Sequence, residues 1–246
     1  GDDTSPTQTF TITIDPVNDE PSFTASNVTV DEDAGAPSIS NWASFTAGPA
    51  NESGQSEQRY IVSNVSNGAL LSTGPSIDAN GDLDFTLAAD ANGTVTFEVA
   101  VQDDGGTANG GDDLSPRQTF TITIDPVNDE PSFTASNVTV DEDAGAQPIS
   151  NWASFTAGPA NESSQGVNDY VVNITGGAGL LTAAGVDFTN TGDLTFEPAT
   201  DANGTVTFEV SVQDNGGTAN GGDDTSPTQT FTITIDPVND EPSFTA

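Results

Sequence analysis

Several stretches of the chain alternate between apolar and polar residues with a period of two. In "TVTFEVAV" (94–101) and "QTFTITID" (118–125), Val, Phe or Ile recurs at every second residue. Side chains of a β-strand point alternately to the two faces of a sheet, so this pattern predicts strands with one buried face. The β-branched and aromatic residues at the apolar positions favour the same structure.

Shorter stretches predict the remaining strands of the first half of the chain, at 26–32, 59–65, 69–72 and 83–87. Asn-Gly pairs favour tight turns, and they lie at 67–68, 80–81, 92–93 and 109–110. About seven short strands separated by turns in about 100 residues are typical of a β-sandwich. We therefore predict an all-β protein built of antiparallel β-sandwiches of about seven strands, without a long helix.

One stretch departs from the period of two. In "ISNWASFTAG" (39–48), Ile39, Trp42 and Phe45 recur at every third residue. This spacing predicts a short helical turn that closes one end of the core. Trp42 and its equivalent Trp152 are accordingly predicted to be core residues.

An internal repeat organises the whole chain. The heptapeptide "DPVNDEP" occurs at 15–21, 125–131 and 236–242, each time after "TFTITI" and before "SFTA". Such regular self-similarity indicates tandem copies of one structural unit.

The heptapeptides define the domain boundaries that we expect. Residues 16–125 form a first β-sandwich repeat and residues 126–236 a second one, joined end to end. Residues 1–15 match the last strand and linker start of a preceding repeat, and residues 237–246 match a linker and the start of a following one. Because each complete repeat has its own last strand, we expect residues 7–14 to be held by another molecule.

The charge balance changes this picture. The chain has 38 acidic residues and 2 basic ones, a formal net charge of −36. Nucleic acids and anionic membrane surfaces would repel such a chain, so we expect neither as a partner. Uncompensated charge also destabilises a compact state, which leaves two alternatives, a disordered chain or one neutralised by cations. The alternating pattern favours the second.

The residue types exclude several chemistries. The 246 residues contain no Cys, His, Met or Lys, so zinc, copper and haem sites, a Ser-His-Asp triad and a thiol nucleophile are not expected. Lys–Asn isopeptide cross-links cannot form either. Paired carboxylates could serve a glycosidase, but the acidic residues lie in predicted turns and no aromatic-lined cleft is indicated. We therefore expect no enzyme.

The end of each repeat resembles a known family. The stretch "FEVAVQDDGGTANGGDDLSPRQTFTITIDPVNDEPSF" (97–133) is similar to the end of a cadherin repeat followed by its linker. The resemblance is closer still to the cadherin-like and immunoglobulin-like repeats of giant bacterial surface proteins and adhesins, many of which carry "VNDxP" linkers. It implies Ca²⁺ at the domain junctions. Ca²⁺ takes six to eight oxygen ligands, and this chain offers oxygen ligands and nothing softer.

The resemblance also implies ligands in the central linker. Asn128 and Asp129 match the Asn-Asp pair of the family. Asp125 corresponds to the leading Asp, although it lies three residues before the Asn rather than two. Glu130 replaces a residue that serves through its carbonyl oxygen.

Further ligands implied by the resemblance lie outside the linker. Glu32 matches the Glu that ends the first strand, and Asp90 matches the first acid of an Asp-x-Glu motif whose Glu is replaced by Asn92. Asp214 matches an acid that the following domain turns back onto the linker. The Asp-x-Asp motif of that domain is missing, and Glu162 in "NES" (161–163) is its nearest substitute. With fewer carboxylates, we expect one or two ions per junction.

The corresponding positions of the other junctions complete the candidate metal ligands: Asp15, Asn18, Asp19, Glu52, Asp103, Glu142, Asp201, Asn203, Asp236, Asn239 and Asp240. Taken singly, each acid is also an ordinary turn residue. The acidic run at 103–113 is either an additional loop site or a flexible hairpin.

Two functions are compatible with these features. The first is a structural extender in a long extracellular surface protein, adhesin or filament, rigidified by calcium at its linkers. Its partners would be neighbouring identical repeats in the same or adjacent chains, with any cell-surface or glycan ligand elsewhere in the parent protein. The alternative is a directly adhesive module that binds another copy or a glycan. No segment is expected to insert into a membrane.

Overall fold

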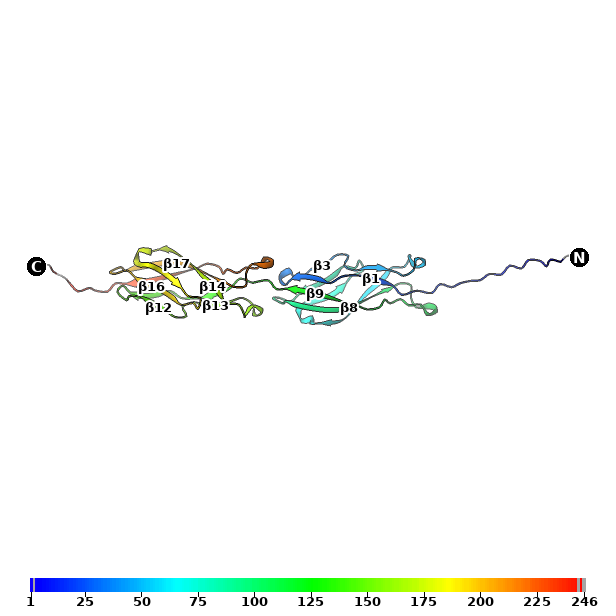
Figure 1. Ribbon diagram of the computed structural model, residues 1–246, viewed down its shortest axis with the longest axis horizontal. Helices are drawn as coiled ribbons and strands as arrows, with labels where there is room; N and C mark the ends of the chain where they lie inside the picture. The colour runs from blue at the N-terminus through cyan, green and yellow to red at the C-terminus, as the bar shows by residue number, and fades with distance from the viewer. Residues whose placement is uncertain (2, 243, 245–246) are drawn as a thin grey trace. The chain divides into compact units, whose positions relative to one another are not determined.

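The chain folds into two β-sandwiches. The computed structural model describes residues 1, 3–242 and 244. The chain divides into two compact units, Gly1–Asp125 (unit 1) and Pro126–Ala246 (unit 2), each all-β in its described part (Figure 1). The fold class predicted from the alternating pattern is thus confirmed. The 3-10 turns of the described residues are too short to cross a membrane.

The strands of unit 1 are β1 Ser22–Thr24, β2 Val28–Asp31, β3 Ser38–Ile39, β4 Ser44–Thr46, β5 Glu57–Ser66, β6 Leu71–Ile77, β7 Leu83–Leu87, β8 Gly93–Asp103 and β9 Gln118–Asp125. Its 3-10 turns are η1 Glu32–Ala34, η2 Ala50–Glu52, η3 Gly68–Leu70 and η4 Ala108–Gly110.

Unit 2 repeats this order of strands with β10 Ser132–Thr134, β11 Val138–Asp141, β12 Gln147–Ile149, β13 Ser154–Thr156, β14 Val167–Gly176, β15 Leu181–Phe188, β16 Leu194–Pro198, β17 Gly204–Asp214 and β18 Gln229–Asp236. Its 3-10 turns are η5 Ala160–Glu162, η6 Ala178–Leu180 and η7 Ala219–Gly221.

Each unit has the same sheet topology. In unit 1 a four-stranded sheet has the order β2-β9-β8-β5, a three-stranded sheet the order β3-β7-β6, and β1 pairs with β4. Unit 2 has the sheets β11-β18-β17-β14 and β12-β16-β15 and the pair β10-β13. The last strand, β9 or β18, runs parallel to β2 or β11 and antiparallel to β8 or β17. The last strand is therefore an inner strand of its sheet.

The predicted strands agree well with these elements, with two corrections. The stretches 83–87 and 118–125 coincide with β7 and β9, whereas the stretch 69–72 begins in η3 and only then enters β6. The helical turn predicted at 39–48 is wrong, because β3 and β4 occupy this stretch with a turn between them. The turn between β3 and β4 interrupts the alternation of apolar and polar residues. Ile39, Trp42 and Phe45 are therefore spaced three residues apart although no helix forms.

The core of each unit is aromatic and aliphatic. Trp42 is buried as predicted, and its indole N–H donates to the Ser26 carbonyl oxygen at 2.7 Å. Its ring lies edge-on to Phe120 at 4.8 Å between centroids, and Trp152 lies likewise against Phe231 at 4.9 Å. Edge-to-face pairs of this kind stabilise a core beyond the burial of their area.

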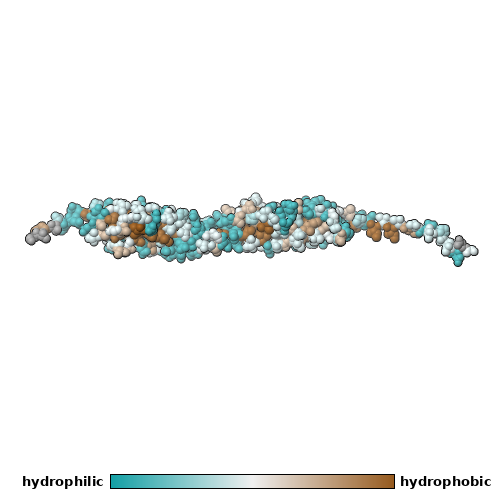
Figure 2. All heavy atoms as spheres, turned by 90° about the horizontal axis from the view of Figure 1, so that it is seen from above, coloured by the Kyte–Doolittle hydropathy of each residue, from teal (hydrophilic) through white to brown (hydrophobic). Residues whose placement is uncertain are grey.

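Residues 7–14 contribute no side chain to this core. Phe10, Ile12 and Ile14 are 86%, 87% and 87% exposed. Figure 2 shows apolar side chains exposed along the thin N-terminal segment. Residues 7–14 therefore do not pack as a strand inside unit 1. The molecule that would hold them stays a prediction.

Candidate metal centres

The linker residues that precede β10 meet buried carboxylates of unit 2. We call Asn128, Asp129, Glu162, Gln165 and Asp214 the proximal cluster of unit 2. The "GPANES" stretch forms η5, in which the Glu162 N–H donates to the Pro159 carbonyl at 3.1 Å. This turn places Glu162 Oε1 where it accepts the backbone N–H of Asp129 at 2.8 Å.

The second half of this cluster comes from the end of β17. Asn128 donates through Nδ2 to Asp214 Oδ1 at 3.2 Å and to the Asp223 carbonyl oxygen at 2.7 Å. The Asp223 N–H in turn donates to the Asn128 carbonyl at 2.8 Å. The loop after β17 therefore holds the linker in place through side-chain and backbone bonds together.

The cluster gathers negative charge away from water. Glu162 and Asp214 are 4% and 2% exposed, and Glu162 Oε2 has no hydrogen-bond partner. Burial raises the pKa of Glu162, and the negative charges of Asp129 and Asp214 raise it further. Buried carboxylates are costly unless a cation or a set of donors compensates them. The arrangement therefore fits a bound cation.

Unit 1 contains the same arrangement. Its proximal cluster consists of Asn18, Asp19, Glu52, Gln55 and Asp103. The Asp19 N–H donates to Glu52 Oε1 at 2.8 Å, and Asn18 Nδ2 donates to Asp103 Oδ1 at 3.1 Å. Glu52 Oε2 and Asp103 Oδ2 are buried without a hydrogen-bond partner. Glu52 Oε2 in unit 1 and Glu162 Oε2 in unit 2 are equivalent atoms, and both lack a hydrogen-bond partner although the two units differ in sequence.

The acidic run at 103–113 proves to be part of this cluster. Asp103 ends β8 and its carboxylate enters the proximal cluster, while the Asp112 N–H donates to the Asn18 carbonyl oxygen at 2.9 Å. The run is therefore a loop bonded to the linker rather than a free hairpin.

Glycine residues leave the space that these oxygens occupy. A Cβ on Gly216 would overlap Asn128 Oδ1, and a Cβ on Gly158 would overlap Glu162 Oε2. In unit 1, a Cβ on Gly105 would likewise overlap Asn18 Oδ1, and a Cβ on Gly48 would overlap Glu52 Oε2.

Gly216→Ala should therefore destabilise unit 2 by about 1–3 kcal/mol, because the added methyl group forces Asn128 away from the loop. Gly179→Ala is the matched control, since a Cβ there meets no atom within 4 Å. Urea unfolding of both variants measures the difference. Equal stabilities would show that the glycine does not shape the cluster.

A second group of carboxylates lies where the chain leaves unit 2. We call Glu142, Asp143, Asp201, Asn203 and Asp240 the distal cluster. Glu142 directly follows β11 and is buried, and its Oε2 accepts a hydrogen bond from Asn203 Nδ2 at 3.0 Å. Its Oε1 accepts the backbone N–H of Val238 at 2.8 Å, so the segment after β18 is bonded to the unit.

Three exposed acids of the distal cluster lie close to one another. The carboxylates of Asp143, Asp201 and Asp240 each place an oxygen within 4.8 Å of the others. The negative charge of Asp201 raises the pKa of Asp240, with smaller contributions from burial, Asp143 and Glu142. In unit 1 the corresponding bond joins Asn92 Nδ2 to Glu32 Oε2 at 3.0 Å. Asp90, like Asp201, adopts a left-handed backbone conformation in the turn after its strand.

Some sequence candidates are placed differently. Asp15 and Glu130 are exposed, and Asp125 and Asp236 end β9 and β18. Asp236 meets the distal cluster through its backbone, because its carbonyl accepts the Glu142 N–H at 3.0 Å. Asn239 donates to the Asp240 carbonyl instead of to a carboxylate.

Sequence reasoning missed two contributors. Asp143 was hidden as the third acid of a short acidic run, and Gln165 carries a neutral amide. A search for oxygen-bearing side chains within three residues of Glu142 and Glu162 would have found both.

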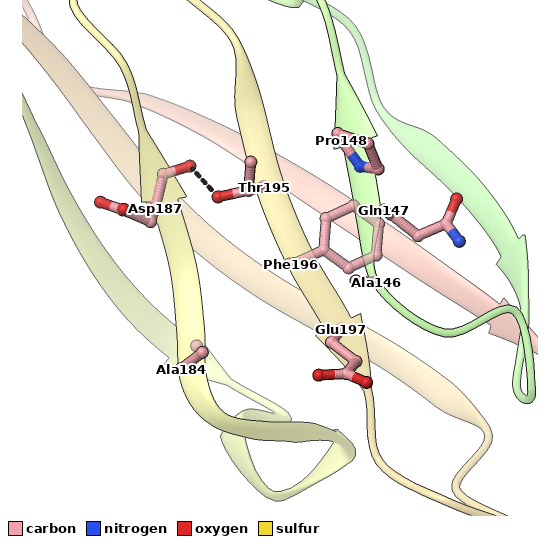
Figure 3. A pocket seen from close by; sticks show the side chains of 9 residues that line it. Ala146, Gln147, Pro148, Ala184, Asp187, Thr195, Phe196 and Glu197 are labelled. Carbon is pink, nitrogen blue, oxygen red and sulfur yellow. Dashed lines mark hydrogen bonds between the residues drawn. The ribbon is translucent and has the colours of Figure 1, made fainter.

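The three-stranded sheet of unit 2 carries a hollow on its outer face. It has a volume of about 280 Å³ and is lined by Gln147, Pro148, Asp187, Thr195 and Glu197, among others (Figure 3). Phe196 beneath it is buried, so no aromatic face is presented to a ligand. Among the described residues, the strongly exposed aromatic side chains are Phe10 and Phe244, both outside the strands. The aromatic platform expected of a glycan-binding module is therefore not found on the described sandwich faces.

Comparison with known proteins supports the fold. No family model matches the chain, and no curated protein matches it in sequence. A crystal structure of human protocadherin-24 EC1-2 (form II) is 16% identical, with a TM-score of 0.52, over 89% of this chain and 99% of that chain. Another crystal structure of human protocadherin-24 EC1-2 is 15% identical, with a TM-score of 0.50, over 91% of this chain and 100% of that chain. At these identities the similarity shows a cadherin-like fold and no more.

Proposed function

We propose that these two units are structural extender repeats of a long extracellular surface protein, adhesin or filament, and that Ca²⁺ at the linkers makes the repeats rigid. The observation that carries the proposal is the proximal cluster. In both units it buries carboxylates beside linker residues and leaves carboxylate oxygens without hydrogen-bond partners.

The donor set of this cluster fits Ca²⁺. In unit 2, Glu162, Asp214 and Asp129 supply carboxylates, and Asn128 and Gln165 supply amide oxygens. Ca²⁺ accepts six to eight such oxygens in flexible geometry, and no nitrogen or sulfur ligand is present to favour a softer metal. When bound, the ion supplies the positive charge that the cluster lacks.

The distal cluster is the second proposed site. Glu142 and Asn203 would hold the ion together with Asp143, Asp201 and Asp240. Glu142 and Asp240 come from opposite ends of the unit's sequence, and Glu142 already bonds to the segment after β18. Binding there would therefore fix the direction in which the chain continues.

Two general arguments support an extracellular location for this proposed function. Extracellular calcium modules bind with dissociation constants of about 10⁻⁴–10⁻³ M, which suits extracellular calcium concentrations. A net charge of −36 also keeps long parallel chains from associating unless cations are present.

Small-angle scattering tests the extender function. In calcium, the full chain should give one narrow distribution of maximum dimensions, and in excess chelator a broader one, because uncompensated linker charges repel. Asp129→Ala should broaden the distribution in calcium while both units keep their circular dichroism. Asp187→Ala, which removes an exposed acid outside both clusters, should scatter like the parent. Identical scattering of parent and Asp129→Ala in calcium would contradict the proposed role of the linker.

A further inference from the structure

The Asn-Gly pairs of the chain differ in how firmly the structure holds them. The chain contains seven such pairs, which begin at Asn67, Asn80, Asn92, Asn109, Asn203, Asn215 and Asn220. In all of them except the pairs at Asn67 and Asn215, an alanine precedes the asparagine, so the local sequences are alike. An Asn-Gly pair is a reactive site as well as a turn former, because glycine has no side chain that would shield its backbone nitrogen.

The reaction of such a pair is an intramolecular deamidation. The backbone nitrogen of the glycine attacks Cγ of the asparagine, gives up its proton and expels the side-chain amide as ammonia, which leaves a succinimide ring. Water then opens the ring at either of its carbonyl carbons. The product is aspartate, or isoaspartate, whose main chain runs through the former side chain and is longer by a methylene group. Water is the only co-reactant.

The structure restrains most of these asparagines. A side-chain hydrogen bond holds Asn67, Asn80, Asn92, Asn203 and Asn215. At Asn80 the restraint is double, because its Nδ2 donates to Asp78 Oδ2 at 2.9 Å and the Gly81 N–H donates to the Asp78 carbonyl oxygen at 3.0 Å. These bonds must break before the glycine nitrogen can reach Cγ.

Asn109 and Asn220 lack this restraint. Both are exposed, and within the described part of the chain neither side chain has a hydrogen-bond partner. They occupy equivalent places in η4 and η7, where each interrupts the turn with a left-handed backbone, at φ 57° and 55°. A Cβ on the following Gly110 or Gly221 would meet no atom within 4 Å, so the space beside the attacking nitrogen is open.

We propose that Asn109 and Asn220 are the preferred sites of spontaneous deamidation in the folded protein, and that isoaspartate formed there loosens the loop from the linker. The loop is bonded to the linker directly after each site. In unit 1 the Asp112 N–H donates to the Asn18 carbonyl oxygen at 2.9 Å, and Asn18 Nδ2 donates to the Asp112 carbonyl oxygen at 2.8 Å. Unit 2 repeats both bonds between the equivalent residues.

The packing leaves no room for a longer main chain at this place. A Cβ on Gly111 would lie 2.9 Å from Asn18 Cβ, so the loop backbone already touches the linker. An additional methylene group at position 109 would push Gly111 and Asp112 against Asn18 or away from it. The bonds between loop and linker would weaken in either case, and this inference does not rest on the proposed calcium sites.

Peptide mapping by mass spectrometry tests the first half of the proposal on the full chain after incubation at mildly alkaline pH. Asn109 and Asn220 should deamidate at least about fivefold faster than the other Ala-Asn-Gly pairs, because those pairs must first break a side-chain hydrogen bond. The same measurement on urea-unfolded protein is the control, in which all Ala-Asn-Gly pairs should react at similar rates. If the native protein shows no preference for Asn109 and Asn220 beyond that in urea, the proposal is wrong.

Hydrogen exchange in chelator tests the second half. Protein that has been incubated until Asn109 and Asn220 are converted should exchange segments 16–20 and 103–113 faster than fresh protein. The variant Asn109→Asp/Asn220→Asp carries the charge of the product on an ordinary main chain and should exchange like fresh protein. The variant Asn109→Gln/Asn220→Gln keeps the amide on a side chain too long for the same ring, and its exchange should not change on incubation. Equal exchange before and after incubation of the parent, or equally fast exchange in the aspartate variant, would overturn the role of isoaspartate.

Discussion

Removing calcium should lower the melting temperature of this protein markedly. At free calcium about tenfold above the dissociation constant, each occupied site adds about 1.4 kcal/mol to the free energy of unfolding. For domains of this size, 1 kcal/mol corresponds to about 4–8 °C in melting temperature. Each site should therefore contribute about 6–11 °C, and a unit with two sites should respond about twice as strongly.

Calorimetry in a calcium titration measures this effect. The melting temperature should rise continuously with calcium concentration and fall to a lower limit in excess chelator. Potassium chloride at matched ionic strength is the control, since it screens the net charge without binding the clusters. A melting curve that is the same in calcium and in chelator would rule out calcium as the stabilising cation.

Glu162→Gln should have opposite effects with and without calcium. In chelator the variant should melt at a higher temperature than the parent, because it removes a buried charge that lies beside Asp129 and Asp214. In calcium it should lose one carboxylate ligand and with it the increment of the proximal site, about 1.4 kcal/mol under the same conditions. The variant should therefore melt at a higher temperature than the parent in chelator and at a lower temperature than the parent in calcium.

The pH dependence of the metal-free protein follows from the same group. The folded-state pKa of Glu162 is raised above that of the unfolded chain, so the folded unit binds this proton more tightly. The contribution of protonated Glu162 to the free energy of unfolding is fully present below its unfolded-state pKa, and it is lost as the pH rises through its folded-state pKa. Between these two pKa values, metal-free Glu162→Gln should show a weaker loss of stability than the parent.

Glu197→Gln is the matched control for both measurements. It removes the same charge from the outer face of the three-stranded sheet, outside both clusters. It should leave the calcium increment unchanged. If Glu162→Gln retains the full calcium increment as well, Glu162 is not a ligand.

Local sequence determined much of this fold. The alternating stretches became β7, β8 and β9, because a period of two places every apolar side chain on one face of a strand wherever that strand pairs. The Asn-Gly pairs at 67–68, 80–81 and 109–110 lie in turns for an equally local reason, since residues such as Asn67 and Asn109 tolerate the left-handed backbone that tight turns require. The pair at 92–93 is an exception, because Gly93 begins β8. The absence of His and Cys likewise restricted the chemistry of any metal site to oxygen ligands.

Tertiary structure decided which acids meet. Asn128 and Asp214 are 86 residues apart, and they form a bond only because the loop after β17 folds back onto the linker. Asp143 and Asp240 approach one another because β11 pairs with β18. Strand pairing depends on contacts between residues distant in sequence, and alternation along a single strand does not specify its partner. The sequence alone therefore determined that acidic turn residues exist in a β-sandwich, and only the paired sheets determined which of them share a site.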